Sequence, residues 1–241
     1  HTCLIDTMRR LGCWGSNATL QLGDRDGDRS VPTVVAGADG ATRLSLGLMH
    51  PCALIAAGEV RCWGSDADGR LGDGGTAVDR DVPMAVMDLG SATSIGVGEL
   101  HSCAVGAAEA FCWGRGTNGR LGDGAATARQ APVPVVDVTD VVEVAGGDDH
   151  SCAIRGDGRL FCWGHNNRDQ LGIDNGSMDV SCPTEVVALG GRAVTSMSLG
   201  NEHTCVVADG EAYCFGRNNL GQRSGSSAAT FEPVRVDGLF P

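Results

Sequence analysis

Short apolar segments alternate with glycine-rich turns along the whole chain. Residues 152–162 show this pattern most clearly, because they are symmetric about Asp157 and carry Asp-Gly at their centre. The pattern predicts a β-hairpin with a three-residue loop, in which Gly158 takes the left-handed position. One face would carry His150, Cys152, Ile154, Leu160 and Cys162, and the other Ser151 and Ala153 opposite Trp163 and Phe161. Because neither face suits water, the hairpin has to be covered on both sides.

The same segment recurs five times. A His-x-Cys motif begins at five positions about fifty residues apart: His1, His50, His101, His150 and His203. A second Cys follows, in Cys-Trp-Gly in four copies and in Cys-Phe-Gly in the last, and then come a turn-rich stretch and a proline-led apolar strand. A period of this length indicates a solenoid or a propeller. We therefore expect one all-β domain over residues 1–241, with repeats at 1–49, 50–100, 101–149, 150–202 and 203–241.

A further short strand closes each repeat and leads into the next His. These strands are expected at 43–46, 92–95, 141–144 and 194–199, whereas nothing precedes His1. The first hairpin should therefore lack its innermost strand. We expect four full four-stranded units and one incomplete unit, in an open arc or a strained ring that flanking sequence completes.

The cysteine spacing predicts disulfides across the hairpins. Directly opposed residues of antiparallel strands have Cα atoms about 4.5 to 5.5 Å apart, which a disulfide accepts. The expected bridges are Cys3–Cys13, Cys52–Cys62, Cys103–Cys112, Cys152–Cys162 and Cys205–Cys214, with Cys182 left over. Each bridge closes a short loop and contributes about 2 to 3 kcal/mol to the free energy of unfolding. This cysteine usage favours an oxidising, extracytoplasmic location, in a secreted or cell-surface protein.

The repeat resembles that of the regulator of chromosome condensation family. The resemblance rests on Gly-x-x-His before the first strand, Trp-Gly, motifs such as Gln170-Leu171-Gly172, and the proline-led strand, and it covers the whole chain. It implies a β-propeller of four-stranded blades, usually seven, of which this chain would supply five repeats. The Cys pair in every copy departs from the eukaryotic founder and is similar to the cysteine-rich bacterial branch.

Composition excludes several classes of function. The formal charge of −12 argues against nucleic acid as a ligand, because phosphate backbones are bound by basic clusters. All 18 basic residues are Arg, so mechanisms that need a lysine amine are absent. No apolar run is long enough to insert into a membrane. There is also no His-Glu-x-x-His or Gly-x-Ser-x-Gly motif, so we expect no enzyme, no catalytic residue and no cofactor.

Two patterns suggest metal sites, but each has a simpler interpretation. His and Cys on one strand face with a second Cys opposite could bind a metal, yet a disulfide explains the Cys pair. We expect the His to be structural, with its ring bonded to backbone groups at the start of the strand. Asp24, Asp26 and Asp28 resemble a calcium loop, but Gly27 comes too early and Val35 stands where a bidentate Glu is needed. We expect no metal. Asn17 and Asn175 lie in glycosylation acceptor motifs, which matter only if the source glycosylates.

Residues that differ between copies are the candidates for binding a partner, since a residue repeated five times serves the blade. The loops 24–30, 73–81, 123–130, 173–181 and 224–230 share little sequence. Specificity should therefore reside in them or in the turns before each His. The loop candidates are Asp79, Arg80, Asp81, Met178 and Asp179, and the turn candidates are Glu99, Asp148, Asp149 and Glu202.

We therefore predict a non-catalytic scaffold that binds a protein partner. One alternative, implied by the family resemblance, is guanine-nucleotide exchange on a small GTPase. Net charge, cysteine content and the absence of Lys argue against it. Another alternative is a secreted enzyme inhibitor of the β-lactamase-inhibitor propeller type, which differs from a general scaffold only in its partner.

Overall fold

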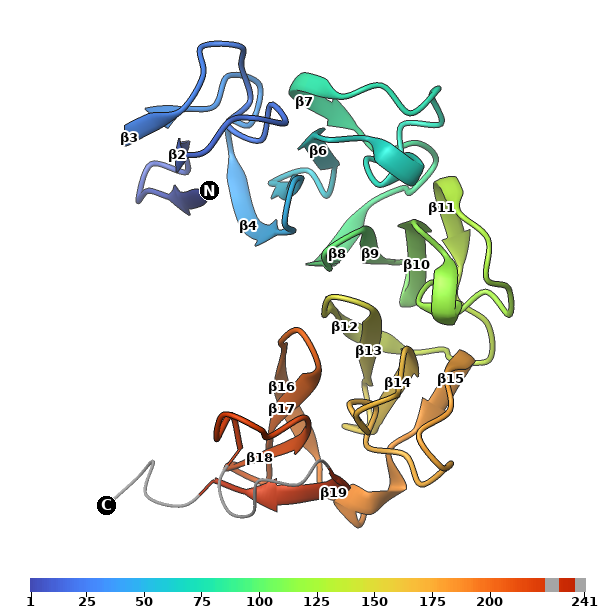
Figure 1. Ribbon diagram of the computed structural model, residues 1–241. Coiled ribbons are helices and arrows are strands. Elements are labelled where there is room, and N and C mark those ends of the chain that lie inside the picture. Colours follow the sequence, from blue (N-terminus) through green and yellow to red (C-terminus); the bar gives the residue numbers. More distant parts are fainter. Residues whose placement is uncertain (224–229, 237–241) are drawn as a thin grey trace.

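The computed structural model describes residues 1–223 and 230–236. Their strands form five antiparallel sheets arranged as an open arc around a common centre (Figure 1). The first sheet contains β1 (Thr2–Ile5), β2 (Leu11–Gly15) and β3 (Arg29–Val34). The second contains β4 (Ala41–Leu46), β5 (Pro51–Ile55), β6 (Val60–Gly64) and β7 (Arg80–Ala85). The third contains β8 (Ala92–Val97), β9 (His101–Gly106), β10 (Glu109–Gly114) and β11 (Arg129–Pro134).

The last two sheets follow the same plan. The fourth contains β12 (Val141–Gly146), β13 (His150–Arg155), β14 (Leu160–Gly164) and β15 (Val180–Glu185). The fifth contains β16 (Val194–Leu199), β17 (His203–Ala208), β18 (Glu211–Gly216) and β19 (Thr230–Arg235). Three short 3₁₀ turns lie in the connections: η1 (Ala67–Gly69), η2 (Thr117–Gly119) and η3 (Val187–Leu189). No helix of the described residues is long and apolar enough to cross a membrane.

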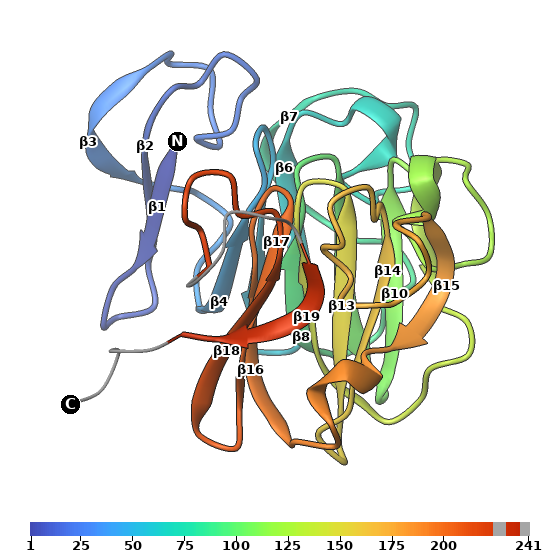
Figure 2. The same cartoon turned by 60° about the horizontal axis from the view of Figure 1, so that its bottom comes forward.

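Each sheet is one blade of a partial propeller, and four of the five blades are complete. The innermost strand of each full blade, for example β4, precedes the repeated His, whereas the first blade has three strands and lacks an inner one. The expectation of four full blades and one incomplete blade in an open arc is therefore confirmed (Figures 1 and 2).

The hairpin register is the one that the cysteine spacing predicts. In the fourth blade Cys152 pairs with Cys162, Ser151 with Trp163 and Ala153 with Phe161. Gly158, with a φ of 82°, occupies the left-handed position of the loop. The ten cysteines form the five expected disulfides, each with a Cα–Cα distance of 4.1 Å, and Cys182 is free.

The hydrophobic core is divided into clusters that lie between neighbouring blades. Trp63 of the second blade, fully buried, belongs to a cluster with Leu11, Leu22 and Val35 of the first blade. Trp113, Trp163 and Phe215 occupy corresponding positions in the following blades. One large ring from each of the second to fifth blades thus packs against small and aliphatic residues of the blade before it, which explains why so few aromatic residues suffice.

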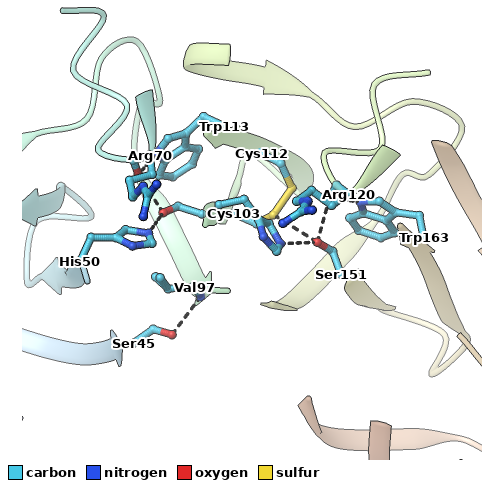
Figure 3. Close-up of a disulfide and its surroundings, with 12 residues drawn as sticks. Ser45, His50, Arg70, Val97, Cys103, Cys112, Trp113, Arg120, Ser151 and Trp163 are labelled. Atoms are coloured by element: carbon cyan, nitrogen blue, oxygen red, sulfur yellow. Dashed lines mark hydrogen bonds between the residues drawn. A yellow bond between two sulfur atoms is a disulfide. The ribbon is translucent and has the colours of Figure 1, made fainter. Parts of the chain in front are cut away.

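A backbone carbonyl fastens each of these interfaces. Ser102 and Trp113 of the third blade both donate to the carbonyl oxygen of Arg70 in the second, at 3.0 Å each. Nε2 of His50, also in the second blade, lies 2.9 Å from the Ser102 hydroxyl (Figure 3). We call this set the interblade latch. It recurs with His101, Ser151, Trp163 and the Arg120 carbonyl.

The latch corrects our expectation for the repeated His. Its ring does not bind backbone groups at the start of its own strand but bonds a hydroxyl of the next blade. Two interfaces have a reduced latch: Phe215 has no N–H to donate to the Gln170 carbonyl that Thr204 contacts, and Pro51 has no hydroxyl beside the Trp63 contact with Gln21.

The latch requires a neutral imidazole. Because the single hydroxyl hydrogen of Ser102 goes to the Arg70 carbonyl, the His50 ring must donate from Nε2. Its Nδ1 atom is then an unprotonated, buried acceptor with no partner among the described residues. Burial lowers the pKa of His50 and of His150 to about 3 each, and it lowers the pKa of His101 well below 6.5.

A glycine three residues before His50, His101, His150 and His203 makes room for each ring. A Cβ atom at Gly47 would lie 2.7 Å from Cε1 of His50, which is closer than side-chain contacts allow. The Gly-x-x-His element is therefore set by the position of the imidazole in the latch.

The hairpin of the third blade carries backbone strain that its counterpart in the fifth avoids. Both have two-residue loops with positive φ at both positions, but the third uses Ala107 and Ala108 where the fifth uses Asp209 and Gly210. An alanine in the left-handed region costs about 1 kcal/mol. Asn-Gly is the preferred sequence for such a turn.

We expect the double substitution Ala107→Asn with Ala108→Gly to raise the free energy of unfolding by about 1 to 2 kcal/mol, since it relieves this strain. Urea unfolding at pH 7 with intact disulfides measures the change. Ala56→Gly is the matched control, because Ala56 has an ordinary φ, and it should be destabilising by up to about 1 kcal/mol. Equal effects of both changes would contradict the strain.

We also expect acid to destabilise the protein through the three buried imidazoles. Their pKa values are lower in the folded state than the ordinary 6.5, so stability is fully present above pH 6.5 and is lost as the pH falls toward 3. Each imidazole should cost roughly 2 kcal/mol by pH 5. Unfolding at pH 7, 6 and 5 measures this, and His101→Gln should remove about one third of the loss. Parallel pH curves for the two proteins would refute the assignment.

Candidate functional site

One end of the arc brings together both groups of residues that the sequence marks as candidates. Because His101 pairs with Gly114 at the end of the β9–β10 hairpin, the turn before the His and the loop after Trp-Gly leave the blade at the same end. The loop candidates and the turn candidates therefore lie on one face of the propeller, which we call the loop face.

A cavity opens at the centre of the arc and reaches this face. Its volume is about 730 Å³, and it is lined by the inner strands β4, β8, β12 and β16 and by the turns that follow them. Glu143 lies on its wall, and Glu99 and Asp148 lie in its turns. Burial raises the pKa of Glu143. The charged residues that line the cavity are all acids, with no Arg among them.

Asp148 is the residue whose ionisation the fold opposes most clearly on this face. Burial, together with the neighbouring carboxylates of Glu99, Asp149 and Glu202, raises its pKa to about 6. Arg120 acts in the opposite direction but does not offset them. An ionised carboxylate that is partly buried among other acids does not stabilise the folded protein. Residues of this kind cluster at functional sites.

The other two turn candidates have strong partners. Asp149 forms an ion pair with the buried Arg120 at 2.5 Å, and Glu202 pairs with Arg217. The Arg120 side chain is only 2% exposed, so Asp149 supplies the charge that this guanidinium needs. In the preceding blade Leu100 occupies the position of Asp149, and Nη1 of Arg70 is buried without a partner among the described residues. Asp149 and Glu202 thus serve the fold as well as the charge of the face.

Three of the five loop candidates hold their loops together. Asp79 accepts a hydrogen bond from the Asp66 backbone N–H at 2.9 Å, and Arg80 pairs with Asp73 at 2.6 Å. The same contacts recur at Asp28–Asn17 and Asp179–Asn166, and at Arg29–Asp24 and Arg129–Asp123. The expectation that these loops share little is therefore wrong. An Asp that binds a backbone N–H and an Arg that pairs with an Asp each recur in three of the loops, although the loop sequences look different.

The remaining loop candidates face solvent or a neighbouring loop. Met178 is 64% exposed, and Asp81 pairs with Arg25 of the first blade. Leu48, 55% exposed, and Met49 form the turn before His50, so one side of the loop face is apolar and the other acidic. Of the loop 224–230, all but Thr230 lies outside the described residues.

The patterns that suggested metal or glycan sites have structural explanations. Asp24 and Asp26 both pair with Arg29, and Asp28 binds a backbone amide. Asn17 is 5% exposed and accepts a hydrogen bond from the Leu22 backbone, so its amide is not available to a glycan. Across residues 1–223 and 230–236, no group of three or more His, Cys, Asp and Glu side chains is arranged to hold a metal.

The repeat is the one that defines a known family. The family description "Regulator of chromosome condensation (RCC1) repeat" matches residues 57–105, 108–154 and 157–207, and a second form of it matches 141–170 and 194–222. The chain belongs to the RCC1 repeat family. Among curated proteins it is similar to protein RCC2 of Mus musculus, with 34% identity over 70 residues that make up 29% of this chain and 13% of that protein.

Solved RCC1-type propellers share the fold of this chain. Human WBSCR16 superposes with a TM-score of 0.85 at 21% identity, over 95% of this chain and 63% of that one. Prp20p from Saccharomyces cerevisiae superposes with a TM-score of 0.82 at 20% identity, over 98% of this chain and 63% of that one. The chain therefore spans less than two thirds of either solved propeller, and the arc matches part of a larger ring.

Substitutions of the adjacent residues Asp148 and Asp149 should change the free energy of unfolding in opposite directions. Asp148→Asn should raise the free energy of unfolding at pH 7 by about 1 to 3 kcal/mol, because ionisation of this carboxyl opposes folding above its raised pKa of about 6. Asp149→Leu should lower it by about 3 to 5 kcal/mol, since Arg120 is left buried without its carboxylate.

Urea unfolding of both variants at pH 7 and pH 5 checks this. The gain from Asp148→Asn should shrink at pH 5, where the native carboxyl is mostly protonated. A loss of stability in Asp148→Asn at both pH values would contradict the role assigned to this charge.

Proposed function

We propose that this chain is a non-catalytic protein-binding propeller, part of a secreted or cell-surface protein of the cysteine-rich bacterial branch of the family. The five disulfides support an oxidising, extracytoplasmic environment. The acidic and the exposed apolar residues of the loop face support binding of a protein partner.

The observation that carries the proposal is the half-buried carboxyl of Asp148, whose negative charge Arg120 offsets only in part. Glu99, Asp149 and Glu202 lie in three neighbouring turns close enough for their charges to act on Asp148, and burial keeps the Asp148 charge costly. Glu99 and Asp148 line the central cavity. A cationic group of a partner would relieve that cost. We therefore infer that the partner presents Lys or Arg side chains to the loop face, with apolar contacts at Leu48 and Met178.

Two narrower functions differ only in the partner. The first is nucleotide exchange on a small GTPase. The solved structure of Prp20p concerns the binding of that protein to Gsp1p and histones. At 20% identity, the similarity to Prp20p shows only that this chain has the same fold. Inhibition of a secreted enzyme is the second. No residue of the loop face favours nucleotide exchange or enzyme inhibition over a general scaffold. The identity of the captured partner will distinguish these functions.

The test is affinity capture from the envelope and secreted fractions of the source organism, followed by binding measurements with the identified partner. Glu99→Gln and Asp148→Asn should each weaken binding about two- to fivefold, as expected for rim charges. Glu109→Gln is the matched control, because Glu109 is an exposed acid at the opposite end of the third blade. It should bind as the unaltered chain does.

The pH dependence gives a second, independent readout. Binding should weaken as the pH falls from 7.5 to 5.5, because Asp148 gains a proton near pH 6. Asp148→Asn should lose most of this dependence, whereas the buried imidazoles do not titrate in the folded protein over that range. Two results would overturn the proposal. One is normal binding by both Glu99→Gln and Asp148→Asn; the other is acceleration, by the purified chain, of nucleotide release from a small GTPase or of substrate hydrolysis.

A further inference from the structure

A buried cation at the loop face lacks the carboxylate that its counterpart in the next blade has. Arg70 and Arg120 occupy corresponding places at successive blade interfaces (Figure 3). Their side chains are almost completely buried and are held alike, because each Nε atom donates to the carbonyl three residues earlier, that of Ala67 or Thr117. Nη1 of Arg120 then contacts Asp149 at 2.5 Å, whereas Nη1 of Arg70 has no partner among residues 1–223 and 230–236.

Leu100 stands where the missing carboxylate would be. Its carbonyl accepts a hydrogen bond from the backbone N–H of Arg115, as the carbonyl of Asp149 does from the residue after Trp-Gly in the fourth blade. The two turns therefore share one backbone arrangement, and their side chains start from equivalent positions. Asp68 pairs with Nη2 of Arg70 at 3.7 Å but does not reach Nη1. A buried guanidinium N–H is thus left without an acceptor, which is costly.

A second cation adjoins the same position. Arg115 is exposed, and its guanidinium forms no ion pair in the part of the chain that the structure describes. In the fifth blade Arg217 has the place of Arg115, and it pairs with Glu202, the residue directly before the repeated His. The fourth and fifth blades thus each match an acid in this turn to one Arg. The third blade has both Arg residues around the turn and an apolar residue, Leu100, in place of the acid.

The charges of the two Arg residues act on each other. Burial, and to a smaller extent the charge of Arg115, lower the pKa of Arg70, although three Asp side chains of the second blade act in the opposite direction. A negative group beside Leu100 would therefore interact favourably with both guanidinium groups.

The surroundings favour a carboxylate over a phosphate or a sulfate. The equivalent turns place carboxylates, those of Asp149 and Glu202, against their Arg residues. Glu99 directly precedes Leu100, and Asp148 lies in the next turn, so a doubly charged anion would be repelled more strongly than a singly charged one.

We propose that Arg70 and Arg115 form a carboxylate-binding site on the loop face, and that Leu100 turns outward when the carboxylate enters. Leu100 is only half-buried, so its side chain is free to move toward solvent. The proposal rests on the protein-binding function proposed above and names a second group that the partner presents, an Asp or Glu side chain or a chain terminus. The site lies in the turn between the apolar turn at Leu48 and the acidic turn at Asp148.

Acetate tests the site without any partner. The full chain is titrated with sodium acetate in place of sodium chloride at constant ionic strength, and the side-chain N–H signals of its Arg residues are followed by NMR. Saturable changes are expected at Arg70 and Arg115 and none at Arg120, because Asp149 already occupies the corresponding position. No saturable change at Arg70, or sulfate binding as tight as acetate binding, would overturn the proposal.

The chain supplies its own matched substitutions. Gln21 and Gln170 stand at the place of Arg70 in the first and fourth blades, and Ser65 stands at the place of Arg115 in the second, so the scaffold already accommodates these side chains. Arg70→Gln should weaken acetate binding about tenfold, since it removes a charged donor. Arg115→Ser should weaken it about threefold, as expected for an exposed charge. Unchanged acetate binding in both variants would refute the assignment.

Two substitutions of Leu100 separate charge from access. Leu100→Asp copies Asp149 and supplies an internal carboxylate, so it should abolish acetate binding and raise the unfolding temperature. Leu100→Asn has nearly the same size without the charge, and it should bind acetate at least as tightly as the unaltered chain. Equal acetate binding by the two variants would contradict the site.

Peptides identify the source of the carboxylate and separate this proposal from the function on which it rests. Acetyl-Ala-Asp-Ala-amide carries only a side-chain carboxylate and acetyl-Ala-Ala-Ala only a terminal one, and the one that displaces acetate more effectively names the source. Displacement by neither would count against a protein ligand at this site. Acetate binding without capture of any protein partner would overturn the proposed function alone. A captured partner that binds Leu100→Asp as tightly as the unaltered chain would overturn the role of the site alone.

Discussion

The structure depends on one buried backbone carbonyl at each blade interface. The carbonyl of Arg70 accepts hydrogen bonds from both Ser102 and Trp113 of the next blade, and the hydroxyl in turn receives the imidazole of His50. A buried carbonyl without partners is costly, so this pairing fixes the position of each blade against its neighbour. The glycine before the His, the neutral imidazole and the small residues around the Trp ring all follow from it.

The same contact determines where the candidate binding residues lie. The residues between the glycine and the His form the turn at the loop face, and the latch holds that turn beside the centre of the arc. Asp148 and Asp149 occupy this turn in the fourth blade, and the corresponding turn of the second blade carries Leu48 and Met49. The scaffold is thus constant, while the two residues of each turn vary in charge and polarity. Asp149 and Glu202 pair with Arg120 and Arg217, whereas the pKa of Asp148 is raised by burial and by the acids around it.

Structural residues of the repeats can be told from variable ones only when the contacts of the blades are compared, and not their sequences alone. Asp79, Arg80 and Asp179 stand in loops that align poorly, yet each makes a contact that other blades repeat. Met178 makes no such recurring side-chain contact and is largely exposed. The candidate interface is accordingly smaller than the loops as a whole, and it lies nearer the centre of the arc.

The sequence by itself determined the all-β class, the repeat, the hairpin registers, the disulfide pairing and the missing inner strand. These features depend on residues close together in the chain, where a period of two and a turn of fixed length leave one arrangement. Only the tertiary structure decided the partner of the repeated His, the ion pair between Arg120 and Asp149, and the convergence of four acids near one cavity. Those contacts join residues of different blades, and their distances depend on the angle between blades, which packing of the large rings sets and local sequence does not encode.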